Sequence, residues 1–169
     1  MRKLLALLCL TLLTACGFQL RGSYELPFDS LYLAIPESAQ LHAVLKRNIE
    51  ASSKTRVSSD AQTAQATLTI LGDAQTKVIL SLSSRGRVSE YQLLRTFTFR
   101  VHDLTGRDFV PQTTVVIRRD MTFSDQQVLA KEAEEVLLRR DMETDLVQQV
   151  MRKLALAKLS VPPADATAR

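Results

Sequence analysis

The middle of the chain alternates apolar and polar residues with a period of two. Such alternation is typical of strands that bury one face and expose the other. It predicts three long antiparallel strands between residues 66 and 123, joined by tight turns at residues 85–87 and 105–108. Arg95 interrupts the apolar register of the middle strand. We expect there either a β-bulge or an edge position from which its guanidinium reaches water, rather than a buried catalytic charge.

The segments on either side have helical periodicity. Apolar residues recur every three or four positions from about 38 to 51, where Ser38 offers an N-cap, and again from about 125 to 158. Ser124 and Gln127 fit a capping box before the second helix. That helix would be roughly 50 Å long, and part of its apolar stripe is expected to project beyond the sheet toward a partner.

A short apolar run at residues 31–35, ended by Pro36, predicts a first strand, and residues 52–65 are polar enough for a connection. The element order is then β-α-β-β-β-α. One apolar sheet face and two apolar helix stripes must bury each other. We therefore predict an α+β fold, a two-layer sandwich in which a four-stranded, mostly antiparallel mixed sheet packs against two helices.

The N-terminus has the pattern of an export signal. Arg2 and Lys3 precede an apolar stretch from residue 4 to 13, which is too short for a membrane span of about 20 residues. The run Leu13-Thr14-Ala15-Cys16 resembles a bacterial lipobox, in which the cysteine becomes the lipidated first residue. We predict a signal peptide at 1–15, and acyl chains on Cys16 that anchor the protein to a membrane surface. Gly17 in place of Asp implies, by resemblance to Gram-negative lipoproteins, sorting to the outer membrane.

The mature chain is expected to form a single domain over 16–160, with a disordered tail at 161–169. Loss of residues 1–15 removes Cys9, and acylation consumes Cys16, so neither a free thiol nor a disulfide is expected. The formal net charge falls from +4 to about +2. Two cysteines among 169 residues also exclude a four-cysteine zinc site.

No motif indicates an enzyme. The chain has no G-x-S-x-G, no phosphate-binding G-x-x-x-x-G-K-[ST] and no H-E-x-x-H. His42 and His102 lack ligand or nucleophile partners at suitable spacing, and the acids Glu132, Glu134 and Glu135 fit a solvated helix face. We expect no catalytic residue, no cofactor and no metal.

Positive charge is concentrated in the strands. Residues 77–119 contain eight basic and three acidic residues, whereas the last helix is close to neutral. Arginine suits bidentate phosphate recognition, and for an envelope lipoprotein the nearest phosphates belong to lipid headgroups or lipopolysaccharide. An ordinary solvated face explains the same charge equally well. Nucleic acid fits poorly, because the protein is exported and only 5% of its residues are aromatic.

Several stretches together resemble the lipopolysaccharide-assembly lipoprotein family LptE: residues 16–21 (CGFQLR), 89–93 (SEYQL) and 129–132 (LAKE). The resemblance implies a non-enzymatic lipoprotein that sits as a plug in the outer-membrane β-barrel protein LptD, helps to assemble it and binds lipopolysaccharide. Its implied binding residues are Arg85, with Arg87 beside it, and Lys131, although Ser84 could take the hairpin position.

We add Arg118 and Arg119 to these candidates from charge alone. Two other classes of protein stay open at this point. A periplasm-facing lipid carrier would need a large apolar cavity, and a lipid-anchored hydrolase would need a convergent nucleophile and base.

Overall fold

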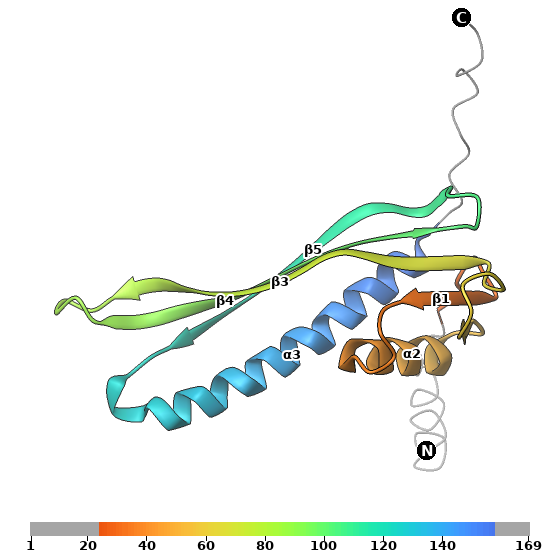
Figure 1. The fold of residues 1–169 in the computed structure, drawn as a ribbon. Coiled ribbons are helices and arrows are strands. Elements are labelled where there is room, and N and C mark those ends of the chain that lie inside the picture. Colours follow the sequence, from red (N-terminus) through yellow and green to blue (C-terminus); the bar gives the residue numbers. More distant parts are fainter. Residues whose placement is uncertain (1–23, 158–169) are drawn as a thin grey trace, which may run out of the picture.

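The computed structural model describes residues 24–157. Its elements are β1 (Ser30–Ala34), α2 (Gln40–Ser52), β2 (Arg56–Ser58), β3 (Ala66–Leu82), β4 (Val88–His102), β5 (Asp108–Thr122), the short 3₁₀ helix η1 (Asp125–Gln127) and α3 (Val128–Ala155). The predicted signal peptide, Cys16 and the tail at 161–169 lie outside the described residues. The two helices cover one face of the sheet, so the predicted α+β two-layer sandwich is confirmed (Figure 1).

The sheet has five strands in the order β2-β1-β3-β4-β5, not the predicted four. β1 is parallel to both of its neighbours, and β3, β4 and β5 form the predicted antiparallel meander. The additional strand, β2, lies in the segment predicted to be a polar connection. It has three residues with Val57 as its one apolar side chain, too few to show a period of two.

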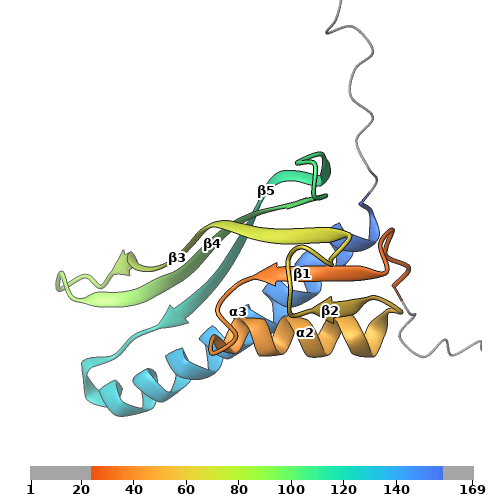
Figure 2. The same ribbon diagram turned by 45° about the vertical axis from the view of Figure 1, so that its right-hand side comes forward.

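The hydrophobic core lies at one end of an elongated molecule. β3 and β4 extend well past β1 and α2, as both views show (Figures 1 and 2). Fully buried apolar side chains come from every layer: Leu31, Leu33, Leu45, Ile49, Leu68, Leu93, Phe97, Phe99, Val101, Leu146, Val150 and Leu154. In α3 all the buried residues lie between Met142 and Leu154, so the first half of this helix contributes none.

The helix starts differ from the predictions. α2 begins after Ala39, which makes no side-chain cap, so Ser38 is not the N-cap. The Ser124 side chain accepts a hydrogen bond from the N–H of Gln126, as part of η1, and does not form the predicted capping box with Gln127. α3 therefore begins at Val128 and ends at Ala155.

Arg95 is neither at a bulge nor at an edge, so that prediction was wrong. β4 is flanked on both sides, and Arg95 pairs in regular register with Gln75 and Ile117. The residue is only 5% exposed. Its guanidinium donates to both carboxylate oxygens of Asp73 on β3, from Nε at 3.0 Å and Nη2 at 2.7 Å. A carboxylate on the neighbouring strand thus replaces the water that the charge would otherwise need.

Candidate functional site

The hairpin between β3 and β4 places Arg85 at the far end of the molecule. Gly86 adopts a φ of 73°, a conformation that glycine tolerates best. The turn is closed by the N–H of Ser83 donating to the carbonyl of Arg87 at 2.7 Å. Arg85 is exposed, and within residues 24–157 its side chain has no ion-pair or hydrogen-bond partner.

Arg87 joins this hairpin to the approach to α3. Its Nη1 lies 3.0 Å from a carboxylate oxygen of Asp125, and both side chains are more than half exposed. The N–H of Phe123 also donates to the carbonyl of Ser89 at 2.8 Å. The hairpin base and the start of the last helix are therefore held together.

Lys131 lies on the first turn of α3 at the same end. Its ammonium donates to the hydroxyl of Thr122, at the end of β5, and to the carboxylate of Glu134, both at 2.8 Å. The side chain is only 15% exposed. The structure thus brings Arg85, Arg87 and Lys131 to one end of the molecule, from two segments, the β3–β4 hairpin and the start of α3.

Arg118 and Arg119 do not join this group as a pair. Successive side chains of a strand point to opposite faces, and Arg119 is ion-paired with Asp145 of α3 at 3.2 Å. Arg118 is exposed on the sheet face away from the helices. Both arginines also lie short of the end of β5. They pair with Leu94 and Leu93 of β4, whereas Thr122, which contacts Lys131, is three or four residues further along β5.

A polar cluster that the sequence pattern does not predict joins the first half of α3 to β3. We call it the polar latch; it is made by Gln75, Lys77, Glu135 and Arg139. Lys77 and Arg139 each lie 2.6 Å from a carboxylate oxygen of Glu135. Arg139 also donates to the side-chain oxygen of Gln75 at 3.0 Å. The hydrogen bond from Lys77, followed by that from Arg139, lowers the pKa of Glu135 despite partial burial. Glu135 therefore does not belong to a merely solvated face, and only its i,i+4 spacing to Arg139 was visible in the sequence.

Exposed apolar side chains accompany the cations at this end. Ile79 and Leu82 near the hairpin are 57% and 58% exposed, and Val128 and Leu129 on α3 are 39% and 82% exposed. This end of the molecule therefore combines cationic hydrogen-bond donors, which suit a phosphate group, with apolar surface, which suits an acyl chain. We call the segments 79–88 and 122–131 the distal end.

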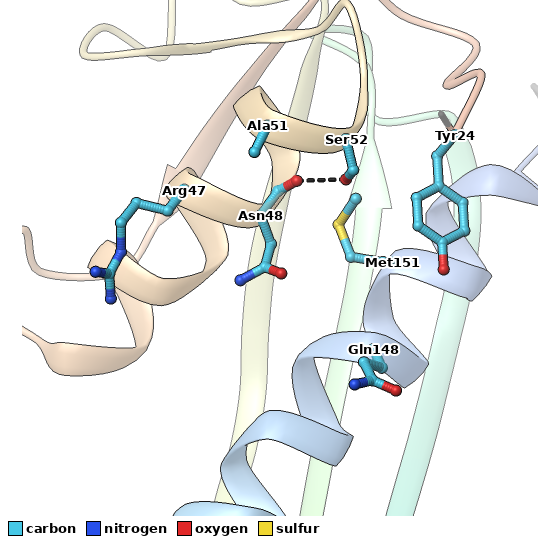
Figure 3. A pocket seen from close by; sticks show the side chains of 7 residues that line it. All are labelled: Tyr24, Arg47, Asn48, Ala51, Ser52, Gln148 and Met151. Atoms are coloured by element: carbon cyan, nitrogen blue, oxygen red, sulfur yellow. Dashed lines mark hydrogen bonds between the residues drawn. The ribbon is translucent and has the colours of Figure 1, made fainter. Parts of the chain in front are cut away.

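A groove of about 480 Å³ lies elsewhere, between α2 and α3 (Figure 3). Its lining combines polar Arg47, Asn48, Ser52 and Gln148 with Tyr24, Ala51 and Met151. This mixed, open lining is not the apolar interior that a lipid carrier requires. Within the described part of the chain, no cluster of three or more His, Cys, Asp or Glu is placed to hold a metal, and no helix is long and apolar enough to cross a membrane.

Comparison with known proteins gives a consistent match. The family model "LptE: Lipopolysaccharide-assembly" matches residues 28–154. The LPS-assembly lipoprotein LptE of Pectobacterium atrosepticum is 31% identical over 150 residues, which cover 85% of this chain and 79% of the relative. The protein of the same name from Yersinia enterocolitica is 31% identical over 160 residues, 90% of this chain and 75% of the relative.

Solved structures agree on the fold. The solution structure of lipoprotein B from Nitrosomonas europaea is 35% identical with a TM-score of 0.71, and the match covers 82% of this chain and 90% of that one. A minor lipoprotein from Acinetobacter baumannii, 24% identical, has the same fold with a TM-score of 0.66 over 81% of this chain and 99% of that one. The chain belongs to the LptE family of lipopolysaccharide-assembly lipoproteins.

Proposed function

We propose that this protein is a non-enzymatic lipoprotein of the outer membrane, anchored through Cys16, that plugs and helps to assemble an LptD-like β-barrel and binds lipopolysaccharide at its distal end. The observation that carries the binding proposal is the convergence of Arg85, Arg87 and Lys131 beside exposed apolar side chains. The lipid portion of lipopolysaccharide presents phosphates next to acyl chains, which is the complementary chemistry.

The three cations differ in how readily they can meet a phosphate. Arg85 is free of intramolecular partners among the described residues. Arg87 is paired with Asp125, but exposed ion pairs contribute only about 0–1 kcal/mol, so a phosphate can displace the carboxylate at small cost. Lys131 is largely covered and must leave Thr122 or Glu134 to bind. We therefore expect Arg85 and Arg87 to make the first contact and Lys131 to join it.

Arg118 and Arg119 stay in the proposal as secondary candidates. Because they lie on opposite faces of β5, one lipid molecule at the distal end is expected to reach only one of them. Arg118 is the better candidate, since Arg119 already pairs with Asp145.

Replacing Arg85, Arg87 and Lys131 together with Asp tests the binding site. We expect at least a tenfold weaker affinity for lipopolysaccharide, with an unchanged circular dichroism spectrum. The matched control replaces Lys46, Arg152 and Lys153, three exposed cations toward the opposite end, with Asp. The same charge change there should alter the affinity less than threefold. Equal affinities of the folded distal variant and the wild type would refute the site.

Affinity purification from detergent-solubilised outer membranes tests the plug. Recovery of an LptD-like barrel with the wild type in a one-to-one ratio supports the proposal. A variant that keeps Cys16 but has a disrupted fold should recover no barrel. Co-purification of lipid without any barrel would favour the lipid-carrier alternative instead.

A further inference from the structure

β3 has a long edge that no strand of residues 24–157 covers. β1 pairs with it only from Ala66 to Thr69. β1 ends at Ala34 and Pro36 follows shortly after, whereas β3 continues to Leu82. Beyond Thr69 β3 has β4 on one side alone, and residues 71–80 are all exposed. Both ribbon views show the β3–β4 hairpin continuing where β1 has stopped (Figures 1 and 2).

The other two edges of the sheet carry features that oppose strand addition. β2 is only three residues long. β5 contains Pro111 and the consecutive charged residues Arg118, Arg119 and Asp120. Short strands, proline and charged side chains are the usual protection of exposed edges.

The free edge of β3 lacks this protection. It has no proline, and its two charged residues, Asp73 and Lys77, are already paired with Arg95 and Glu135 on the helix side of the sheet. The side chains on the other face of the same stretch are uncharged: Ala74, Thr76, Val78 and Leu80. A strand added here would therefore meet a neutral surface, and a charged strand would lose hydration without gaining a partner.

Register shifts delimit the usable edge. They occur between Ile70 and Gly72 and again between Ile79 and Ser81. Between them Gly72–Ile79 pairs regularly with β4, which gives a straight ladder roughly 27 Å long at about 3.4 Å per residue.

We propose that Gly72–Ile79 binds one extended, uncharged segment of the β-barrel partner by strand addition, along the line that β1 leaves vacant. This inference rests on the proposed function and specifies where the plug contacts its barrel. Main-chain hydrogen bonds would supply the affinity, and Val78, with Leu80 at the register shift that ends the segment, would select a small apolar partner strand.

The position of α3 favours a single segment over a second copy of this chain. α3 runs beside this edge, where Gln75 and Lys77 contact Arg139 and Glu135. A dimer formed by two-fold pairing of β3 edges would place a second α3 on the same face of the joined sheet. The charged residues of the two polar latches would then lie near each other. An isolated strand needs only about 4.8 Å of lateral space.

Hydrogen exchange on the purified complex tests the inference. The alternate amides of residues 72–79 that point away from β4 should exchange at least tenfold more slowly in the barrel complex than in the free protein, because the other amides already donate to β4. The variant Val78→Lys/Leu80→Lys should recover at least fivefold less barrel, because both side chains are about half exposed and the change disturbs pairing rather than folding. The control Thr114→Lys/Val116→Lys on β5, at exposed positions of the same sheet face, should recover barrel within twofold of wild type.

The outcomes separate the two proposals. Failure of the wild type to recover any barrel would overturn the proposed function and this inference with it. A complex that forms normally while residues 72–79 exchange as in the free protein would overturn the inference alone. So would sedimentation of the free wild type as a dimer that the Val78→Lys/Leu80→Lys variant abolishes, since the occupant would then be a second copy.

Discussion

The buried ion pair between Arg95 and Asp73 allows a sharp test of how this sheet tolerates a charge beneath α3. In the wild type the Arg95 side chain is only 6% exposed, and in the variant Asp73→Ala its guanidinium loses both hydrogen bonds, at 3.0 and 2.7 Å. In the variant Arg95→Met the buried charge itself is removed and replaced by an apolar side chain of similar length.

The structure sets the size of the two effects. Leaving a buried charge without its partner costs about 3–5 kcal/mol. Asp73 is 28% exposed, so water can reach the vacated place in part, and we expect Asp73→Ala to lower the free energy of unfolding by about 2–3 kcal/mol. Arg95→Met should cost less, about 1 kcal/mol, because the Asp73 carboxylate that it leaves unpaired is 28% exposed and stays partly hydrated.

Urea unfolding monitored by circular dichroism measures both variants and their combination. The double variant Asp73→Ala/Arg95→Met should be close to Arg95→Met in stability and more stable than Asp73→Ala. A loss below about 0.5 kcal/mol for Asp73→Ala would show that the pair is worth no more than an exposed one. A larger loss for Arg95→Met than for Asp73→Ala would refute the desolvation argument itself.

Three further predictions concern the rest of the fold. Leu146→Ala, at a fully buried position, should lower the free energy of unfolding by about 2–5 kcal/mol in urea titrations, whereas Leu137→Ala on the same helix, 59% exposed, should change it by less than about 0.5 kcal/mol. Glu135→Gln should cost about 1 kcal/mol at neutral pH; because the pKa of Glu135 lies below its ordinary 4.5, the gap to wild type should close as the pH falls below that value. Asp103 lies in the turn between β4 and β5, where hydrogen bonds, first that from Thr105, lower its pKa to about 2. Its carboxyl carbon should therefore titrate near pH 2 by NMR, and Asp103→Ala should speed amide exchange in this turn. A midpoint near 4 for Asp103 would contradict the turn geometry.

Periodicity predicted the layers because α2 and β4 bury one face along their length, whereas β3 and α3 do so only at the end that forms the core. The alternation along β4 follows its buried residues Leu93, Phe97, Phe99 and Val101. β2 escaped detection because its pairing depends on where α2 returns the chain, not on any pattern in its three residues. The partner of Arg95 was equally invisible, since Asp73 lies 22 residues away and is a neighbour only in the folded sheet.

The distal end was predictable in part. Gly86 marks a turn, so the exposure of Arg85 follows from the sequence, and the resemblance to a known family supplied Lys131. That Lys131 is held by Thr122 depends on the path of the chain through η1 and could not be predicted. The placement of Arg118 and Arg119 on opposite faces of β5, in contrast, follows from strand alternation alone. Summing charges along the chain does not take this alternation into account.

The buried core and the proposed binding site lie apart along this molecule. The second half of α3 supplies all the buried residues of that helix, whereas the first half is held by the polar latch and by Lys131. The Arg87–Asp125 pair is exposed and contributes little to the free energy of unfolding. The buried residues of α3 begin only at Met142, so substitutions at the distal end should leave the core intact. A loss of lipopolysaccharide binding in the Arg85, Arg87 and Lys131 variant can then be assigned to the lost cations. The same holds for the variant Val78→Lys/Leu80→Lys. Both side chains are exposed and belong to no part of the core, so a loss of barrel recovery can be assigned to the β3 edge.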